Sequence, residues 1–187
     1  MEDRNFYLFA GVNGVGKSTL FSIMTEDIKG TFRINTDEIV KKIGNWKNES
    51  DQIKSAKIAI KLRNEYIEKG LSFNEETTLT GKTILKLIDK LKNKDYKLHL
   101  FYIGINSVDT VKERIRNRVL RGGHDIPDKI VEKRYNESLE NLSKVLKKFD
   151  NVTVYDNTKE YKMILKIINK KIIKQSDELP NWAKNIF

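Results

Sequence analysis

The stretch that decides the fold is Gly11-Val12-Asn13-Gly14-Val15-Gly16-Lys17-Ser18, which fits the pattern G-x-x-x-x-G-K-[ST]. An apolar run over residues 6–10 precedes it, and residues 17–29 carry apolar side chains at helical spacing. Its three glycines let the backbone curl so that N–H groups and a helix N-terminus face an anion. This order of strand, loop and helix predicts a phosphate-binding P-loop.

The P-loop predicts binding of ATP together with Mg²⁺. We expect Lys17 to reach the β- and γ-phosphates and Ser18 to place its hydroxyl on Mg²⁺. The alternative is a glycine-rich turn that binds no ligand. The residues predicted to bind the nucleotide are Gly11, Asn13, Gly14, Val15, Gly16, Lys17, Ser18 and Thr19.

Predicted strands and helices alternate along the rest of the chain. Strands are expected at residues 31–34, 71–73, 97–103 and 151–155, and helices at 51–69, 81–93, 107–120, 127–148 and 161–173. This alternation predicts an α/β fold, a three-layer sandwich in which helices flank a parallel sheet of about five strands. Ligands of such folds bind at the carboxyl ends of the strands.

Composition narrows the class of protein. The 187 residues carry 36 Lys and Arg against 26 Asp and Glu, a formal net charge of +10 that invites a nucleic-acid interpretation. However, 28 of these basic residues are lysines scattered along the chain, without interleaved aromatic side chains. A solvated basic surface is the alternative, and we do not expect nucleic acid as a partner.

Cysteine and hydropathy exclude other classes. The chain has no Cys and only two His, which excludes disulfides and thiolate zinc sites. No apolar run approaches the ~20 residues that span a bilayer, and residues 1–5 lack an apolar signal region. We therefore expect no membrane association and a cytoplasmic location.

Acidic side chains follow two of the predicted strands. Asp37 lies where a carboxylate can orient an acceptor hydroxyl and take its proton. The alternative is that Asp37 only opens the helix that starts near Glu38. Glu76, Thr77 and Thr78 offer a carboxylate and two hydroxyls to substrate, with Glu76 also a candidate Mg²⁺ ligand, unless this segment only initiates a helix.

Arginines are concentrated in one region: five of the eight fall between residues 114 and 134. Arg114, Arg118 and Arg121 share one helix face, and Arg134 lies on the next predicted helix. Such a row is similar to the mobile lid of small phosphotransferases, where guanidinium groups neutralise charge on the transferred phosphoryl. The alternative is salt bridging to nearby acids such as Asp128.

The two histidines are treated separately. His124, after Gly122 and Gly123, either contacts phosphate or substrate ribose or makes a hydrogen bond that orders the loop. His99 lies midway along an apolar strand and is expected to belong to the core.

The order of these segments resembles the zeta-toxin-like family of bacterial P-loop kinases. The matching pieces are GVNGVGKST at 11–19, RINTDEI at 33–39, SFNEETTLTG at 72–81, RVLRGGHDIPDKIVEKRYNESLENL at 118–142 and VYDNT at 154–158. Many unrelated enzymes share the P-loop, whereas GGHDIP followed by RY and NL is far more specific.

We expect a P-loop kinase domain over residues 1–174, with a lid at about 108–134, and a tail at 175–187 that either packs through Trp182 and Phe187 or is loose. The resemblance itself covers about residues 6–158. It implies that Asp37 is the general base and that Lys17 and Ser18 serve phosphates and Mg²⁺. The catalytic residues expected in this way are Asp37, Lys17, Arg118 and Arg134. Arg114 and Arg121 are implied to bind ATP, and Asn157 to flank the adenine.

Family members studied as toxins phosphorylate a sugar hydroxyl of UDP-N-acetylglucosamine. The resemblance thus implies a small-molecule kinase that transfers the ATP γ-phosphate to a nucleotide sugar, with a small antitoxin protein as partner. One alternative is a polynucleotide or nucleoside kinase, or a nucleic-acid-binding ATPase. Another is an ATP-gated switch that a partner protein reads.

Overall fold

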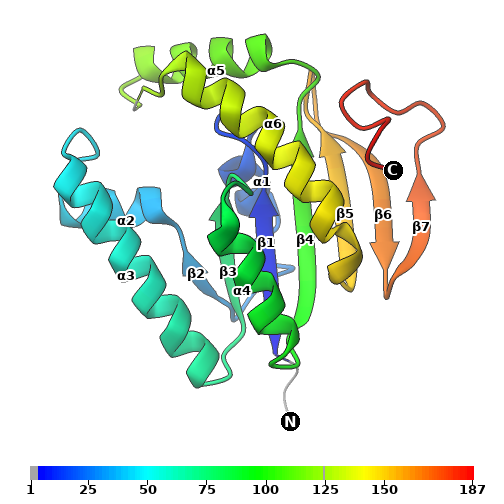
Figure 1. The fold of residues 1–187 in the computed structure, drawn as a ribbon, viewed down its shortest axis with the longest axis horizontal. Coiled ribbons are helices and arrows are strands. Elements are labelled where there is room, and N and C mark those ends of the chain that lie inside the picture. The colour runs from blue at the N-terminus through cyan, green and yellow to red at the C-terminus, as the bar shows by residue number, and fades with distance from the viewer. Residues whose placement is uncertain (1–3, 124) are drawn as a thin grey trace.

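The computed structural model describes residues 4–123 and 125–187 (Figure 1). Its strands are β1 (Asn5–Ala10), β2 (Phe32–Ile34), β3 (Phe73–Thr77), β4 (Lys97–Gly104), β5 (Asn151–Asp156), β6 (Lys162–Ile168) and β7 (Lys171–Gln175). Its helices are α1 (Lys17–Ile23), α2 (Thr36–Ile43), α3 (Glu49–Glu68), α4 (Lys82–Lys92), α5 (Val108–Leu120) and α6 (Asp128–Val145), with a 3₁₀ turn, η1 (Leu146–Lys148).

The strands of the described residues form one sheet in the order β2-β3-β1-β4-β5-β6-β7. Strands β2, β3, β1, β4 and β5 are parallel, whereas β6 and β7 are antiparallel to their neighbours. The predicted α/β class is confirmed, and the five parallel strands match the prediction. The complete sheet is mixed and has seven strands.

The predicted helix at residues 161–173 is wrong, because this segment forms the hairpin of β6 and β7. The turn between them has positive φ at Asn169 and Lys170 (48° and 64°), as a tight hairpin turn requires. Isoleucine-rich flanks favour strands over helices. In addition, the Asn169 N–H donates to the Asn151 side chain at 2.9 Å, which fixes the turn beside β5.

Two predicted boundaries also change. The helix expected over residues 17–29 ends at Ile23, and turns lead from it to β2. The strand expected at residues 71–73 instead covers Phe73–Thr77. Glu76 and Thr77 therefore belong to the last residues of a parallel strand and not to a helix-initiating loop.

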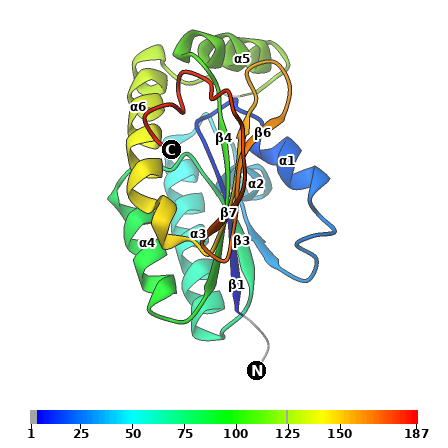
Figure 2. The ribbon, with the colours of Figure 1, turned by 90° about the vertical axis from the view of Figure 1, so that its right-hand side faces the viewer.

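Helices cover both faces of the sheet, which Figure 2 shows nearly edge-on, with α3, α4 and α6 on one side and α1 on the other. Alternate residues of β1 supply the two apolar cores: Phe6 and Leu8 pack toward α3, α4 and α6, while Phe9 packs toward α1 and α5. Helix α5 crosses the carboxyl ends of the strands (Figure 1). The fold thus places α5 over the edge where ligands of parallel sheets bind.

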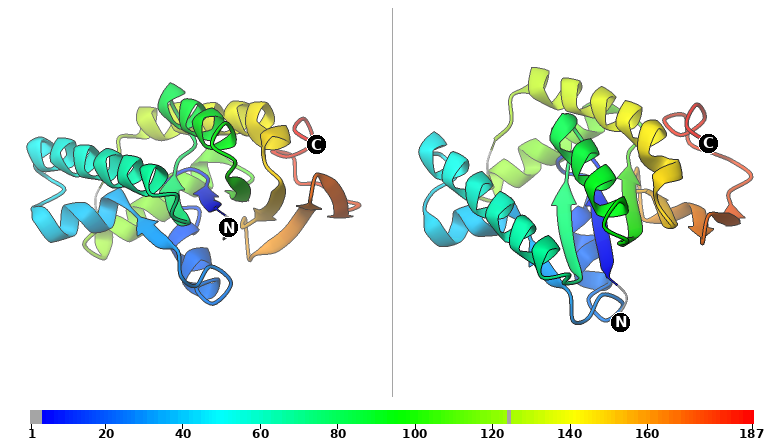
Figure 3. Two further views of the ribbon diagram at one scale, coloured as in Figure 1. Left: turned by 90° about the horizontal axis from the view of Figure 1, so that it is seen from below. Right: turned by 60° about the horizontal axis from the view of Figure 1, so that its bottom comes forward.

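The C-terminal segment lies against the sheet on the β6–β7 side (Figures 1 and 3). Trp182 is 7% exposed and packs on Gly104, where a Cβ atom would come within 2.3 Å of the indole ring. The indole N–H donates to Asp156 at 2.8 Å. Within the described residues, no helix has the length and apolar character needed to cross a membrane.

Candidate active site

The P-loop connects β1 to α1 at the carboxyl edge of the sheet. Gly11, Gly14 and Gly16 have φ of 135°, 78° and 105°, which side chains other than glycine rarely adopt. A Cβ atom at Gly11 would lie 2.3 Å from the Ile103 carbonyl oxygen, and one at Gly16 would lie 2.2 Å from the Tyr161 hydroxyl. These two glycines are therefore required by close approach as well as by φ.

Two side chains that follow β5 support the P-loop. The Asn157 side-chain amide donates to the Val15 carbonyl at 2.9 Å, and the Tyr161 hydroxyl donates to the Gly16 carbonyl at 2.6 Å. Both acceptors are main-chain atoms of the loop, so these hydrogen bonds hold its curvature. Tyr161 is absent from the sequence-based prediction, because it lies 145 residues away from Gly16 along the chain.

The ammonium of Lys17 lies inside the curl of the loop. Lys17 Nζ donates to the carbonyl oxygens of Gly11 and Val12 at 2.8 and 3.0 Å. Burial lowers the pKa of Lys17 to about 8, with opposing contributions from the carboxylates of Glu76 and Asp37. A half-buried cation held by the loop at the wall of an open cavity is suited to an anionic ligand.

A cavity of about 850 Å³ opens beside Lys17. Its lining comes from the P-loop, from β2 and α2, from the start of α3, from the end of β3, and from α5 and α6. The residues predicted for a site that line it are Asn13, Gly14, Gly16, Lys17, Ser18, Thr19, Asp37, Glu76, Thr77, Thr78, Arg114, Arg118, Arg121 and Arg134. The tertiary structure thus gathers residues from most of the predicted motifs around one space.

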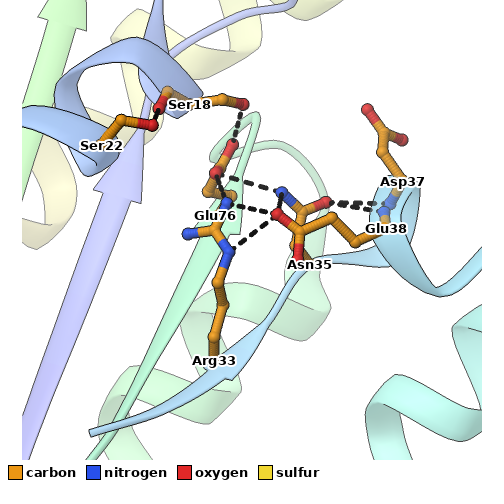
Figure 4. Close-up of polar contacts among 7 residues, drawn as sticks. All are labelled: Ser18, Ser22, Arg33, Asn35, Asp37, Glu38 and Glu76. Atoms are coloured by element: carbon orange, nitrogen blue, oxygen red, sulfur yellow. Dashed lines mark hydrogen bonds and ion pairs between the residues drawn. The ribbon is translucent and has the colours of Figure 1, made fainter. Parts of the chain in front are cut away.

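Glu76 is the centre of a polar network at this cavity (Figure 4). One carboxylate oxygen accepts from the Ser18 hydroxyl at 2.9 Å. The other accepts from Arg33 at 2.5 Å and from the Asn35 amide at 3.1 Å. Because Arg33 also pairs with Glu38, this network links the P-loop, β2, β3 and α2.

Asp37 points away from that network, and its carboxylate has no hydrogen bond to residues 4–123 or 125–187 (Figure 4). The N-cap of α2 is Asn35, whose side-chain oxygen accepts from the N–H groups of Asp37 and Glu38 at 2.9 and 3.3 Å. The capping role weighed for Asp37 is therefore filled by Asn35. Asp37 lies in the first turn with its carboxylate open to the cavity.

Glu75 lines the cavity from a more deeply buried position. It is 7% exposed, and burial raises the pKa of its carboxyl group. The Arg63 guanidinium of α3 acts in the opposite direction, because it binds both carboxylate oxygens, with Nε 3.0 Å from one of them. Arg63 approaches from the helix side and is not among the residues that line the cavity.

The arginines of α5 and α6 face the P-loop. Arg134 donates to the Asn13 side chain at 2.9 Å, and Arg114 donates to the carbonyl oxygens of Asn157 and Thr158 at 2.8 and 3.1 Å. The nearby acid Asp128 instead pairs with Arg116, whose side chain is 67% exposed. Asp128 is thus paired with Arg116, whereas the groups that accept these hydrogen bonds from Arg114 and Arg134 are uncharged.

Some predicted site residues lie elsewhere. Gly11 and Val15 shape the P-loop without lining the cavity, and Asn157 supports the loop from outside it. His124 lies outside the described residues. The cavity also exposes side chains that the sequence-based prediction did not include: Asn35, Thr36, Val40, Trp46, Gln52, Ser55, Ala56, Glu75 and Asn117. Most of them belong to α2, α3 and the connection between them, where no motif marks a site.

The donor set at the P-loop fits Mg²⁺. The Ser18 hydroxyl and the Glu76 carboxylate are adjacent hard oxygen donors. Residues 4–123 and 125–187 contain no cluster of three or more His, Cys, Asp or Glu that would form an all-protein cage. Mg²⁺ is ordinarily held by one or two protein oxygens with water and substrate phosphates, so this sparse set is sufficient.

Comparisons with known proteins identify the family of the chain. The family model described as Zeta toxin matches residues 2–167. An uncharacterized protein of Haemophilus influenzae is 35% identical over 127 residues, which cover 68% of this chain and 89% of that protein.

Solved structures share the fold. A structure from the PezAT chromosomal toxin-antitoxin system of Streptococcus pneumoniae has a TM-score of 0.63 and 21% identity, covering 87% of this chain and 71% of that chain. The structure of AvrRxo1-ORF1:-ORF2 with ATP has a TM-score of 0.74 and 15% identity, and the match covers 98% of this chain and 63% of that chain. A putative kinase from Chloroflexus aurantiacus has a TM-score of 0.56 and 15% identity, and the match covers 74% of this chain and 78% of that chain.

Proposed function

The chain belongs to the zeta toxin family, and from that premise we propose that it is a Mg²⁺-dependent kinase that transfers the ATP γ-phosphate to an alcohol hydroxyl. The observation that carries the proposal is the open Asp37 carboxylate, which shares one cavity with the P-loop and its Lys17. A P-loop by itself supports only nucleotide binding. A carboxylate across the cavity from it supplies the base that transfer to a hydroxyl needs.

Each group has a role that follows from its position. Lys17 and the loop N–H groups hold the phosphates, and Ser18 with Glu76 holds Mg²⁺, which would neutralise phosphate charge. Asp37 orients the acceptor hydroxyl and takes its proton. Arg118 and Arg134 stabilise negative charge on the transferred group, with Arg114 and Arg121 as further phosphate contacts.

The acceptor implied by the family resemblance is a nucleotide sugar such as UDP-N-acetylglucosamine. It enters the test as one candidate beside free sugars, polyols and nucleosides. The nucleic-acid alternative is tested in the same assay with RNA and DNA oligonucleotides that carry a free 5′-hydroxyl.

The test measures phosphate transfer from Mg²⁺-ATP to this acceptor panel by mass spectrometry, with ATP affinity measured separately. Asp37→Asn should retain ATP binding and lower transfer on the order of 10²- to 10⁴-fold, as loss of a general base does. The control is Glu49→Gln, an exposed acid in the first turn of α3 that does not line the cavity. Full transfer by Asp37→Asn would overturn the assignment of the base.

We propose a small antitoxin protein as a partner on the basis of the family relationship. Expression of the chain alone in a bacterial host should arrest growth if the chain acts as a toxin, and Asp37→Asn should abolish the arrest. Arrest by both forms would point to an effect unrelated to phosphate transfer, such as binding by the basic surface.

A further inference from the structure

The charges that line the cavity are unevenly distributed. Its cations are Lys17 of α1, the arginines of the α5 segment and Arg134 of α6. The part formed by β2, α2, α3 and the end of β3 contributes no Lys or Arg to the lining found among the described residues. We call this second part the acceptor half. Asp37 belongs to it, so the accepting hydroxyl of the proposed reaction would lie there.

The acceptor half carries carboxylates whose cationic partners lie behind them. Arg63 pairs with Glu75 and Arg33 pairs with Glu76, and neither arginine lines the cavity. The Arg63–Glu75 pair is balanced, whereas Arg33 is shared between Glu76 and Glu38. Together with the open Asp37 carboxylate, this gives the acceptor half a net negative charge. An anionic group on the acceptor would therefore meet negative charge and no cation to replace its hydration.

Lysines of the neighbouring segments do not change this balance. Lys54, Lys57 and Lys61 of α3 are exposed side chains that do not line the cavity. Lys47 lies with Nζ 5.7 Å from the centroid of the Trp46 ring and does not line it either. These lysines therefore provide no cation at the wall of the acceptor half.

The rest of the lining is neutral. Trp46, Val40 and Ala56 provide apolar surface, and Thr36, Ser55 and Thr78 provide hydroxyl groups. An aromatic ring beside neutral hydrogen-bonding groups suits a compound with apolar C–H faces and several hydroxyls. The cavity of about 850 Å³ is of a size that admits a nucleotide and a small acceptor together.

We infer that the acceptor is an uncharged polyhydroxyl compound, a free sugar, polyol or nucleoside, and that phosphorylated and nucleotide-linked forms of the same compound are poor acceptors. This inference rests on the proposed kinase function. In the transfer the acceptor oxygen forms a bond to the γ-phosphorus as the bond to the β–γ bridging oxygen breaks. The hydroxyl proton goes to Asp37, and ADP leaves with the electron pair of the broken bond.

The experiment compares two sets of acceptors. N-acetylglucosamine and its 1-phosphate, like uridine, UMP and UDP, differ only in phosphate content, and UDP-N-acetylglucosamine is included as the nucleotide-linked form of the sugar. We expect the uncharged member of the preferred set to have the highest kcat/KM. Addition of the first phosphate should lower kcat/KM at least tenfold. Preference for a phosphorylated member would overturn the inference and leave the kinase function standing.

A charge variant tests the physical cause. Ala56→Lys adds a cation to the acceptor half without removing a hydrogen bond, and it should reduce the discrimination against phosphorylated acceptors at least tenfold. The matched control is Ile60→Lys, one helical turn along α3 at an exposed position that does not line the cavity. If Ala56→Lys leaves the ratio of kcat/KM between uncharged and phosphorylated acceptors unchanged, the electrostatic explanation is overturned.

ATP binding distinguishes failure of the acceptor inference from failure of the proposed kinase function. If no compound of either set gains phosphate while ATP still binds, the inferred acceptor class is overturned. If ATP does not bind in the presence of Mg²⁺, the proposed kinase function falls together with it.

Discussion

Arg134 of α6 donates a hydrogen bond from Nη1 to the side-chain oxygen of Asn13 in the P-loop, across 2.9 Å. This contact places a guanidinium at the loop before any ligand is bound. A preorganised cation next to the transferred phosphoryl avoids reorganisation during the reaction. The relationship between these two residues therefore makes Arg134 a measurable contributor to transfer.

Arg134→Gln should lower kcat about 10²- to 10³-fold with little change in stability, because removal of one preorganised donor has effects of that size. Arg116→Gln is the control, since Arg116 belongs to the same basic segment but pairs with Asp128 at the surface. Steady-state kinetics of both variants provide the measurement. Equal effects of the two substitutions would contradict a specific role for Arg134.

ATP affinity should fall as pH rises above about 8. Lys17 loses its proton near that pH in the free protein, because burial lowers its pKa to about 8, while triphosphate binding favours the charged form. Binding above pH 8 should accordingly take up as much as one proton. Titration calorimetry in two buffers of different ionisation enthalpy measures this uptake.

Lys17→Arg is the control for that experiment, since a guanidinium stays charged throughout the range. The ATP affinity of Lys17→Arg should not fall between pH 8 and higher pH, whether that affinity is stronger or weaker than the wild-type value. Constant wild-type affinity from pH 7 to 9.5 would show that Lys17 is not the titrating group.

Acid should destabilise the protein partly through His99. Burial, with a smaller contribution from Lys97, lowers the pKa of His99 to about 4. Between pH 6.5 and 4 the unfolded chain therefore binds a proton that the folded chain does not, and the stability contributed by the neutral imidazole is lost as pH falls. Its ring nitrogens contact Asn5 and Asn151, and the side chain is half-buried, so His99 lies at the margin of the core and not inside it as the sequence predicted.

Urea unfolding at pH 7 and pH 5 measures this effect. The loss of unfolding free energy between the two pH values should be smaller in His99→Gln than in the wild-type chain. An identical loss in both proteins would assign the acid sensitivity to carboxylates alone.

The C-terminal segment should contribute to stability. Trp182→Ala should lower the free energy of unfolding by about 3 kcal/mol, the usual cost of truncating a buried aromatic side chain. Ile172→Ala on β7, where the side chain is 62% exposed, should change it by less than about 0.5 kcal/mol. Chemical denaturation of both variants is the measurement. A negligible effect of Trp182→Ala would support the proposed boundary that treats residues 175–187 as a tail.

Sequence alone was sufficient for the P-loop and for the alternation of strands and helices as far as β5. Both depend on neighbours along the chain: glycines that permit positive φ, a lysine at the start of a helix, and apolar runs with a period of two or 3.6 residues. The position of Asp37 beyond a strand end was also predictable, because carboxyl ends of parallel strands share one edge.

Only the tertiary structure decided which partners these groups have. The helical interpretation of residues 161–173 failed because pairing with β5 and the turn at Asn169 outweigh local helical periodicity. The pairing of Arg33 with Glu76 joins positions 43 residues apart, and Asn157 reaches Val15 across 142. Such contacts depend on the order of strands in the sheet, which no local pattern encodes. The acceptor half lacks lining cations for the same reason, because Arg33 and Arg63 lie behind the carboxylates they pair with.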